Sequence, residues 1–375
     1  MIHLEDFDYE LPPDRIARHP VERRDQSRLL VVERATGAFQ HCRFREIGDF
    51  LRVGDLLVLN DSRVIPARLY ARRHPGGGRV EVFLVNEIEP LVWRALVRPG
   101  KKIRKGERLV VEPVAAECGA GILPVENHGQ DAHATRLECE VVGYAGKGER
   151  IVRFETRAED WNRLLQAFGH TPLPPYILKA RKLADEPPDD TADDRERYQT
   201  VYATAPGSVA APTAGLHFTE QLIATLEQGG VEFARVTLHV GPGTFQPLTG
   251  EHLAAGQLHE EQYSLDTGQV EKINRARREG RRVIPVGTTS VRVLESACNS
   301  EGRLVAQSGT TRLLITSGFP FRFADAMITN FHLPRSSLLL LICAFAGRET
   351  ILRAYREAIE QDYRFYSYGD AMLIL

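Results

Sequence analysis

The spacing of apolar residues changes abruptly along the chain, and this change limits the possible folds more than any other feature. Between residues 64 and 154, apolar and polar side chains alternate in short segments separated by turns such as 74–78. Alternation with a period of two is typical of half-buried strands, and successive strands without helices predict a small barrel or sandwich. Beyond Tyr198, helical spacing alternates with short apolar strands. That pattern predicts a layered α/β domain.

We therefore expect a mixed fold of the α/β class with two domains. Residues 1–63 and 155–375 form a discontinuous α/β domain, and residues 64–154 form an all-β, barrel-like domain inserted into it. Within the α/β part, residues 218–227 have helical spacing and Thr219 can cap the helix. Residues 180–197 are charged and contain prolines, which favours a mobile loop over a site.

Residues 112–136 are rich in glycine and histidine, and we expect an extended loop of the β domain there. Cys118, His128, His133 and Cys139 lie close together in the sequence, so a zinc site has to be weighed against a solvated insertion. Zinc ligands usually come in pairs two to four residues apart, and these residues are not so paired. The insertion is the favoured interpretation, and we expect no metal.

The composition is that of a globular protein, with 43% hydrophobic and 26% charged residues. The longest apolar run, residues 338–346, is about half of what a membrane span needs, and no secretory signal opens the chain. Five scattered cysteines without a C-x-x-C pair indicate reduced thiols. We therefore expect a cytoplasmic enzyme.

The charges balance over the whole chain, with 48 basic and 50 acidic side chains. Residues 1–110 nevertheless carry 21 basic and 16 acidic side chains, a surplus of five, and arginine dominates. Arginine recognises phosphate well, so a nucleic-acid surface is one explanation. A genome that favours arginine codons, together with a solvated charged face, is the simpler one.

Polar clusters lie at several predicted strand ends, where open α/β sheets bind their ligands. Residues 286–292 combine a glycine, hydroxyl groups and Arg292 at a helix start, which suits an anion as well as ordinary capping. His217 could titrate near neutral pH or be structural. Glu260 and Glu261 beside His259 could tune a general base or form a charged surface. Asn330 and His332 could recognise a purine edge or bond to each other.

Familiar nucleotide and hydrolase motifs do not occur in the sequence. There is no G-x-x-x-x-G-K-[ST], no strand followed by G-x-G-x-x-G, no G-x-S-x-G and no H-E-x-x-H. P-loop hydrolases, Rossmann dehydrogenases, common esterases and zinc peptidases are therefore disfavoured. The residues alone leave an α/β enzyme of open activity.

Eight ordered segments extend this result, because together they resemble the S-adenosylmethionine:tRNA ribosyltransferase-isomerase family of queuosine biosynthesis. The resemblance runs from end to end of the chain, and the loop at 112–136 is its main departure. No segment is decisive alone, and the order of all eight is very unlikely by chance. The segments are residues 6–12, 59–68, 197–203, 211–218, 238–247, 287–292, 329–334 and 366–372.

The resemblance implies an α/β domain with an inserted β-barrel and an activity that needs no metal or other cofactor. S-adenosylmethionine would be a consumed co-substrate. Its ribosyl part would be transferred to the aminomethyl group of 7-aminomethyl-7-deazaguanine at the tRNA wobble position, leaving epoxyqueuosine-tRNA, adenine and methionine. The sulfonium would acidify the ribose 5′ protons, so that a base removes one, adenine leaves, the amine adds and closure to the epoxide expels methionine.

Such a reaction needs a base, a proton donor for adenine and groups that hold the methionyl carboxylate. On this resemblance we assign His217 or Glu260 to proton transfer and Arg292 with Thr288 and Thr289 to carboxylate binding. The remaining residues expected around the substrates are Asn60, Asp61, Arg63, Gln199, Asn330 and His332. The anticodon stem-loop of tRNA is expected across Arg72, Arg73, Arg98, Lys101 and Lys102, and the enzyme is expected to be a monomer.

Two other classes compete with this hypothesis. A methyltransferase would share the cofactor and the tRNA but should show a glycine-rich first loop, which is absent. A catalytically silent RNA-binding module would account for the barrel but lacks interleaved aromatic residues. The products distinguish the three hypotheses. The ribosyltransferase-isomerase releases adenine and methionine, the methyltransferase releases S-adenosylhomocysteine, and the RNA-binding module releases none.

Overall fold

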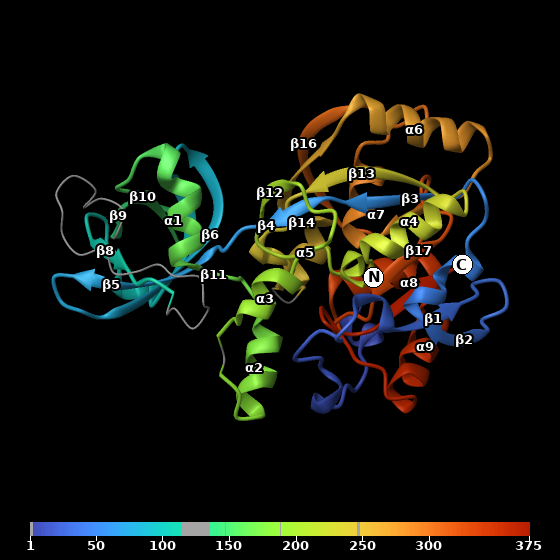
Figure 1. Ribbon diagram of the computed structural model, residues 1–375, viewed down its shortest axis with the longest axis horizontal. Coiled ribbons are helices and arrows are strands. Elements are labelled where there is room, and N and C mark those ends of the chain that lie inside the picture. The colour runs from blue at the N-terminus through green and yellow to red at the C-terminus, as the bar shows by residue number, and fades with distance from the viewer. Residues whose placement is uncertain (1–2, 115–135, 147, 188, 246–247) are drawn as a thin grey trace. The chain divides into compact units, whose positions relative to one another are not determined.

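The structure is a computed structural model of the 375-residue chain. It describes residues 3–114, 136–146, 148–187, 189–245 and 248–375 (Figure 1). The chain divides into two compact units. The first, the α/β unit, comprises Met1–Arg63, Pro174–Pro188 and Arg197–Leu375, and the second, the barrel unit, comprises Val64–Leu173 and Asp189–Glu196.

A nine-stranded sheet forms the centre of the α/β unit, and its strand order is β16-β14-β13-β3-β15-β17-β18-β1-β2. A separate pair joins β4 (Ser62–Val64) to β12 (Ala205–Ser208). The strands of the large sheet, in chain order, are β1 (Arg28–Val32), β2 (Phe39–Arg43), β3 (Leu56–Asn60), β13 (Glu232–Leu238), β14 (Gln257–Leu265), β15 (Val283–Val286), β16 (Gln307–Leu313), β17 (Met327–Asn330) and β18 (Ala371–Ile374).

The middle strands β13, β3, β15 and β17 run parallel, and their carboxyl ends lie at one edge of the sheet. In register, Val236 lies opposite Asn60, and Val286 lies opposite both Leu59 and Ile328. β18 is antiparallel to β17, so the chain enters β18 at that same edge. Residues that follow the parallel strands and residues that precede β18 therefore gather in one place.

Helices cover the sheet, and apolar side chains fill the space between the layers. Thr219 caps α4 as predicted, since its side chain accepts a hydrogen bond from the N–H of Leu222. The helices of this unit are α2 (Pro175–Leu183), α4 (Glu220–Gln228), α5 (Gly250–Ala255), α6 (Thr267–Arg278), α7 (Thr288–Ser296), α8 (Ser337–Ala346) and α9 (Arg348–Glu360), with the 3-10 helices η1 (Leu4–Phe7), η2 (Pro13–Arg15), η3 (Arg24–Gln26), η4 (Phe44–Phe50), η8 (Thr213–His217) and η9 (Pro242–Phe245).

The barrel unit is a closed six-stranded antiparallel barrel with the order β5-β6-β7-β10-β9-β8, closed by the pairing of β5 with β8. The short strand β11 pairs with β5 outside the closed ring. Its elements are β5 (Arg68–His74), β6 (Arg79–Glu89), β7 (Val92–Arg98), η5 (Gly100–Lys102), β8 (Arg108–Val111), β9 (Leu137–Gly146), β10 (Glu149–Phe154), η7 (Ala158–Asp160), α1 (Trp161–Phe168), β11 (Gly169–His170) and α3 (Ala192–Arg197), whose last residue is in the α/β unit.

The structure confirms the predicted fold class, an α/β architecture with an inserted all-β barrel. Two local predictions need correction. Residues 155–173 belong to the barrel unit, because Trp161 packs against Phe154 and Trp93 of the barrel strands. The segment expected as a loop at 180–197 is helical at both ends, because α2 continues to Leu183 and α3 begins at Ala192.

Some other expectations concern residues that the structure does not describe. Most of the predicted loop at 112–136, with Cys118, His128 and His133, lies outside them, and Cys139 is a buried thiol in β9. The cysteines that the structure describes are free. No helix in the described part of the chain combines the length and apolar composition needed to cross a membrane.

Candidate active site

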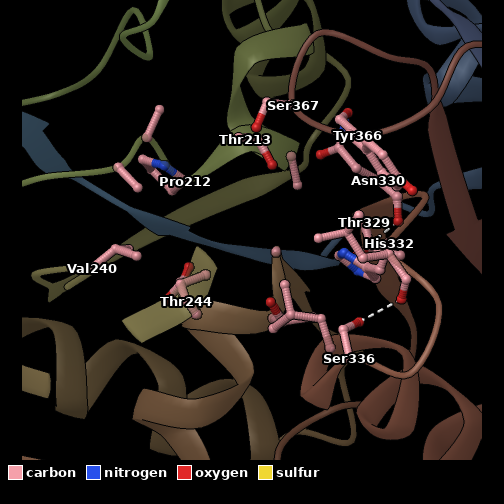
Figure 2. A pocket seen from close by; sticks show the side chains of 18 of the residues that line it. Pro212, Thr213, Val240, Thr244, Thr329, Asn330, His332, Ser336, Tyr366 and Ser367 are labelled. Carbon is pink, nitrogen blue, oxygen red and sulfur yellow. Dashed lines mark hydrogen bonds between the residues drawn. The ribbon is translucent and has the colours of Figure 1, made fainter. Parts of the chain in front are cut away.

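A pocket of about 850 Å³, including the part open to solvent, lies in the α/β unit at the carboxyl ends of β15 and β17 (Figure 2). This is the edge where the parallel strands end, and open α/β sheets bind ligands there. Segments that are far apart in the chain meet around it. The lining residues are Tyr176, Tyr198, 210–214, Val240, Thr244, 287–289, Arg292, 329–333, Ser336, Leu338, Tyr366 and Ser367.

The amino end of α7 forms one wall of the pocket. Gly287 precedes the helix with φ +86°, a conformation that favours glycine, and no side chain caps the helix. The first N–H groups of a helix have no acceptor within it, and no acidic residue occupies this first turn. Thr289 adds a buried Oγ1 that has no hydrogen-bond partner among the described residues. The wall is therefore suited to an anion.

Arg292 adds a buried cation to this wall. It is 5% exposed and forms an ion pair with Glu261, which is 7% exposed. Its Nε donates to the carbonyl of Leu313 at 3.2 Å, and its Nη2 has no partner among the described residues. Glu261 also accepts from the N–H of Gly241 and from Thr244 Oγ1, at 3.3 and 3.2 Å. The pair is thus fixed in position, with the guanidinium Nη2 still available as a donor.

The Asn330 side chain, at the end of β17, is buried, and its amide is fixed by its neighbours. Nδ2 lies 3.1 Å from His217 Nε2, 3.2 Å from the carbonyl of Tyr366 and 3.5 Å from the carbonyl of Asp370. Oδ1 is buried and without a partner within the described residues. This end of the pocket therefore offers an unpaired neutral acceptor.

His217 lies behind Asn330 and does not line the pocket. Its Nδ1 is 2.7 Å from Ser27 Oγ, and burial lowers its pKa to about 3, with the charges of Arg364 and Arg24 acting in the same direction. Both ring nitrogens are occupied by hydrogen bonds, and the imidazole is neutral near pH 7. The geometry therefore does not favour the role in proton transfer that we expected for His217.

His332 is the imidazole that lines the pocket. Its Nε2 lies 2.7 Å from Thr329 Oγ1, and its backbone N–H donates to Tyr355 Oη at 2.7 Å. Burial lowers the pKa of His332 to about 3, so this imidazole is also neutral. A neutral imidazole facing a pocket can accept a proton from a bound ligand.

The loop between α9 and β18 completes the pocket with Tyr366 and Ser367. Asp370 organises this loop, because its carboxylate accepts from the backbone N–H groups of Arg28 and Arg364 at 2.9 and 2.8 Å. Tyr366 has φ +72°, which is unusual for a bulky residue and is held in place by the loop. Ser367 Oγ lies 2.6 Å from Tyr176 Oη.

Several residues expected at the site lie outside the pocket lining. Asn60 is fully buried, and its side chain bonds to the backbone of Leu238. Asp61 accepts from Thr204 and Thr237, at 2.8 and 2.7 Å. The polar side-chain atoms of these two residues therefore form hydrogen bonds within the fold, which join the end of β3 to neighbouring segments.

Arg63, Gln199 and Glu260 also lie away from the pocket lining. Arg63 is exposed on β4, and Gln199 is half-buried next to Tyr198, which does line it. Glu260 is exposed and pairs with Arg312 at 2.9 Å on the outer face of β14. A solvated ion pair is not suited to general acid–base chemistry at the pocket. By contrast, Thr288, Thr289, Arg292, Asn330 and His332 are brought together as expected.

Glu261 is a polar residue that the sequence analysis noted beside His259 but to which it assigned no role. A signal was present, because in a strand alternate residues face the same side, and Glu261 shares its face with Tyr263 and Leu265, both buried. Tyr366 and Ser367 belonged to a segment of the resemblance but carried no predicted role.

The five basic residues expected to contact tRNA lie on the barrel unit and fall into two groups. Arg72 pairs with Glu112 at 2.6 Å, and Arg73 makes two hydrogen bonds to Glu107. Arg98, Lys101 and Lys102 are exposed around η5 and form no ion pair with any residue that the structure describes. The second group is the better candidate for phosphate contacts.

Among the described residues, no group of three histidine, cysteine or acidic side chains could hold a metal ion. The four ligands considered for zinc are not tested by this result, because three of them lie outside the described ranges.

Fold and site together define an enzyme of the α/β class, with a polar ligand pocket at the sheet edge and an inserted barrel. Residues 4–374 match the family model described as queuosine biosynthesis protein. The chain is 48% identical over 372 residues to the S-adenosylmethionine:tRNA ribosyltransferase-isomerase of Carboxydothermus hydrogenoformans, with 99% of each chain covered. It is 46% identical over 376 residues to the protein of that name from Thermotoga maritima, again with 99% of each covered.

A solved structure gives the same result. The crystal structure of the Thermotoga maritima S-adenosylmethionine tRNA ribosyltransferase aligns with a TM-score of 0.52 and 38% identity, covering 99% of this chain and 100% of that one. The chain therefore belongs to the queuosine biosynthesis protein family.

Proposed function

We propose that this protein is an S-adenosylmethionine:tRNA ribosyltransferase-isomerase. It transfers and isomerises the ribosyl part of S-adenosylmethionine onto the aminomethyl group of 7-aminomethyl-7-deazaguanine in tRNA, and it releases adenine and methionine. The observation that carries the proposal is the full-length similarity to relatives of that name. The polar pocket at the sheet edge supports it, because three lining residues there hold buried polar atoms without partners in the described structure.

The charged wall of the pocket is suited to the methionyl carboxylate. Arg292 Nη2 and Thr289 Oγ1 are the unpaired donors on that wall, and the open end of α7 next to them favours negative charge. Glu261 keeps Arg292 in place without using its Nη2. In this proposal S-adenosylmethionine is a consumed co-substrate, and the reaction uses no metal or resident cofactor.

We assign the removal of the ribose 5′ proton to His332 rather than to His217 or Glu260. His332 lines the pocket as a neutral imidazole, whereas His217 is behind the wall and Glu260 is on the outer face of β14. A pKa of about 3 makes His332 a weak base, and the adjacent sulfonium compensates by acidifying the proton that is removed.

The product mixture tests the proposed function. Purified protein is incubated with S-adenosylmethionine and tRNA carrying the aminomethyl-deazaguanine base, without added metal, and the products are separated by chromatography. Adenine and methionine, together with a modified tRNA nucleoside, are expected. S-adenosylhomocysteine would instead indicate methyl transfer, and an unchanged cofactor would refute the activity.

Hydrogen exchange tests the role of His332. S-adenosylmethionine deuterated at the ribose 5′ carbon is expected to lose deuterium to water in the wild-type protein. His332→Gln should retain binding of the cofactor, measured by calorimetry, and lose the exchange. Glu260→Gln is the matched control and should exchange normally. Normal exchange in His332→Gln would show that another group removes the proton.

The tRNA surface is proposed around η5 of the barrel unit, where Arg98, Lys101 and Lys102 are exposed. Because each phosphate contact releases counterions, replacing these three residues by glutamine should reduce the slope of log K against log salt by about 3. A control variant with Arg278→Gln and Arg356→Gln removes exposed charges from α6 and α9 of the other unit. Equal slopes in the wild-type protein and the η5 variant would place the tRNA elsewhere.

We further propose that the enzyme acts as a monomer in the cytoplasm, where its tRNA substrate is modified. Light scattering at micromolar concentration tests the first point, and a mass near twice 42.0 kDa would contradict it.

A further inference from the structure

The Asn330 amide is held in one orientation. Its Nδ2 is surrounded by three acceptors, which are His217 Nε2 and the carbonyls of Tyr366 and Asp370. Turning the amide over would place Oδ1 against those acceptors and lose the hydrogen bonds. The fold therefore presents Oδ1, which is buried and has no partner among the described residues, as an acceptor at the pocket wall.

His217 contributes to this orientation through its tautomer. Ser27 Oγ donates to the carbonyl of Arg24 at 3.2 Å, so it is left to accept a hydrogen bond from His217 Nδ1, 2.7 Å away. With its proton on Nδ1, the ring has an unprotonated Nε2 toward Asn330. The chain of hydrogen bonds from Arg24 to Asn330 thus determines that Oδ1, and not Nδ2, of Asn330 is the amide atom left to bind a ligand.

The two sides of the pocket differ in charge, and this decides which part of a ligand meets Asn330. Figure 2 shows Thr244 on one side and Asn330 and Tyr366 on the other. Thr244 bonds to Glu261, the partner of Arg292, so that side is the charged one. The lining residues on the Asn330 side carry no charge, and they include Tyr366 and Tyr176, whose ring centroids are 4.8 Å apart. A ligand with a carboxylate at one end and a purine at the other fits with its purine at Asn330.

We propose that Asn330 Oδ1 accepts a hydrogen bond from the exocyclic 6-amino group of the adenine in S-adenosylmethionine, and that His217 is a positioning residue for this contact. The inference rests on the proposed function for the identity of the ligand. It makes Asn330 a specificity residue, because a 6-oxo purine would place a second acceptor against Oδ1.

Cofactor analogues test this contact in the wild-type protein without tRNA. Calorimetry compares S-adenosylmethionine with its 6-oxo analogue and with an analogue that lacks the 6-substituent. Loss of the hydrogen bond should weaken binding about 10-fold, and opposing acceptors should weaken it about 100-fold or more. Equal affinities for the three compounds would overturn the proposal.

Variants then test the positioning role. His217→Leu removes the acceptor for Asn330 Nδ2 and should narrow the preference for the 6-amino over the 6-oxo compound, whereas His217→Gln can supply an oxygen acceptor and should largely restore it. Thr289→Val, at the charged end, should weaken both compounds equally and leave the ratio unchanged. If the ratio of the two affinities is the same in the wild-type protein and in all these variants, His217 does not position Asn330. Rescue by glutamine separates positioning from a merely structural defect, which glutamine would not restore.

The two proposals can fail separately. If the wild-type protein prefers the 6-amino compound but releases no adenine in the presence of tRNA, the proposed function fails and the inference holds. If adenine is released but the three compounds bind equally, the inference alone fails. A weaker affinity of His217→Leu for tRNA, with equal affinities for the three compounds, would assign Asn330 to the aminomethyl group of the tRNA base instead.

Discussion

Two neighbouring glutamates on β14 lie on opposite faces of the strand, one buried and one exposed. Glu261 points inward and pairs with Arg292, both of them 6% exposed in their side chains. Glu260 points outward and pairs with Arg312, with side-chain exposures of 48% and 56%. The residue types are the same, and the strand places them on opposite sides.

The comparison shows that the contribution of a glutamate–arginine pair to stability depends on whether the pair is buried. A buried charge that loses its partner cannot be solvated, whereas an exposed one simply returns to water. Only the inner pair can therefore hold a donor in a fixed position for a ligand. The same contrast separates the polar network at Asn330 from the exposed basic residues around η5.

Glu261→Ala gives the largest expected effect. Removing the carboxylate leaves Arg292 buried without its partner and should destabilise the α/β unit by about 3–5 kcal/mol. Urea denaturation followed by circular dichroism measures this change. A loss below about 1 kcal/mol would mean that water reaches Arg292, and the contrast between the two faces would disappear.

Acidification tests the buried imidazoles in the same way. Burial lowers the pKa values of His217 and His332 to about 3, from 6.5 in the unfolded chain, and lowers that of His239 as well. The unfolded state binds the protons, so stability is constant above about pH 7 and falls as the pH decreases toward 3. At pH 5, each of His217 and His332 should lower the free energy of unfolding by about 2 kcal/mol relative to its value at pH 7.

Denaturation at pH 7 and pH 5 measures this loss, and NMR identifies its source. The ring signals of His217 and His332 should not titrate between pH 8 and pH 5. Titration of either buried ring near pH 6.5 would contradict the assigned burial.

Arg292→Lys separates the two functions of the inner arginine. Lysine can still pair with Glu261, but it has a single donor nitrogen in place of the guanidinium fork and therefore lacks the unpaired Nη2. The KM for S-adenosylmethionine should rise about 10-fold to 30-fold, with tRNA affinity little changed. Steady-state kinetics and a tRNA binding assay measure the two, and equal losses would remove Arg292 from the carboxylate site.

Glu260→Ala gives the smallest expected effect. The exposed pair with Arg312 should contribute no more than about 1 kcal/mol, and less at high salt. Stability and activity should remain near those of the wild-type protein. A large loss of activity in a stable Glu260→Ala variant would return Glu260 to the list of catalytic candidates.

The sequence predicted the fold better than the site. Helical spacing indicated the helix at 218–227 and its cap at Thr219, because these depend on residues close together in the chain. The clusters at 287–292 and 329–332 were found because strand ends are recognisable. The surroundings of His217 and Glu260 were not predicted, since these depend on neighbours that the local sequence does not specify.

By itself, the sequence indicated the α/β class, the inserted barrel and the polar segments that reach the sheet edge. Only the tertiary structure decided that Glu261 meets Arg292 and that His217 meets Ser27, 190 residues away in the chain. The physical reason is burial. Removal from water makes an imidazole neutral, fixes an amide and preserves an ion pair, and burial results from packing between distant segments.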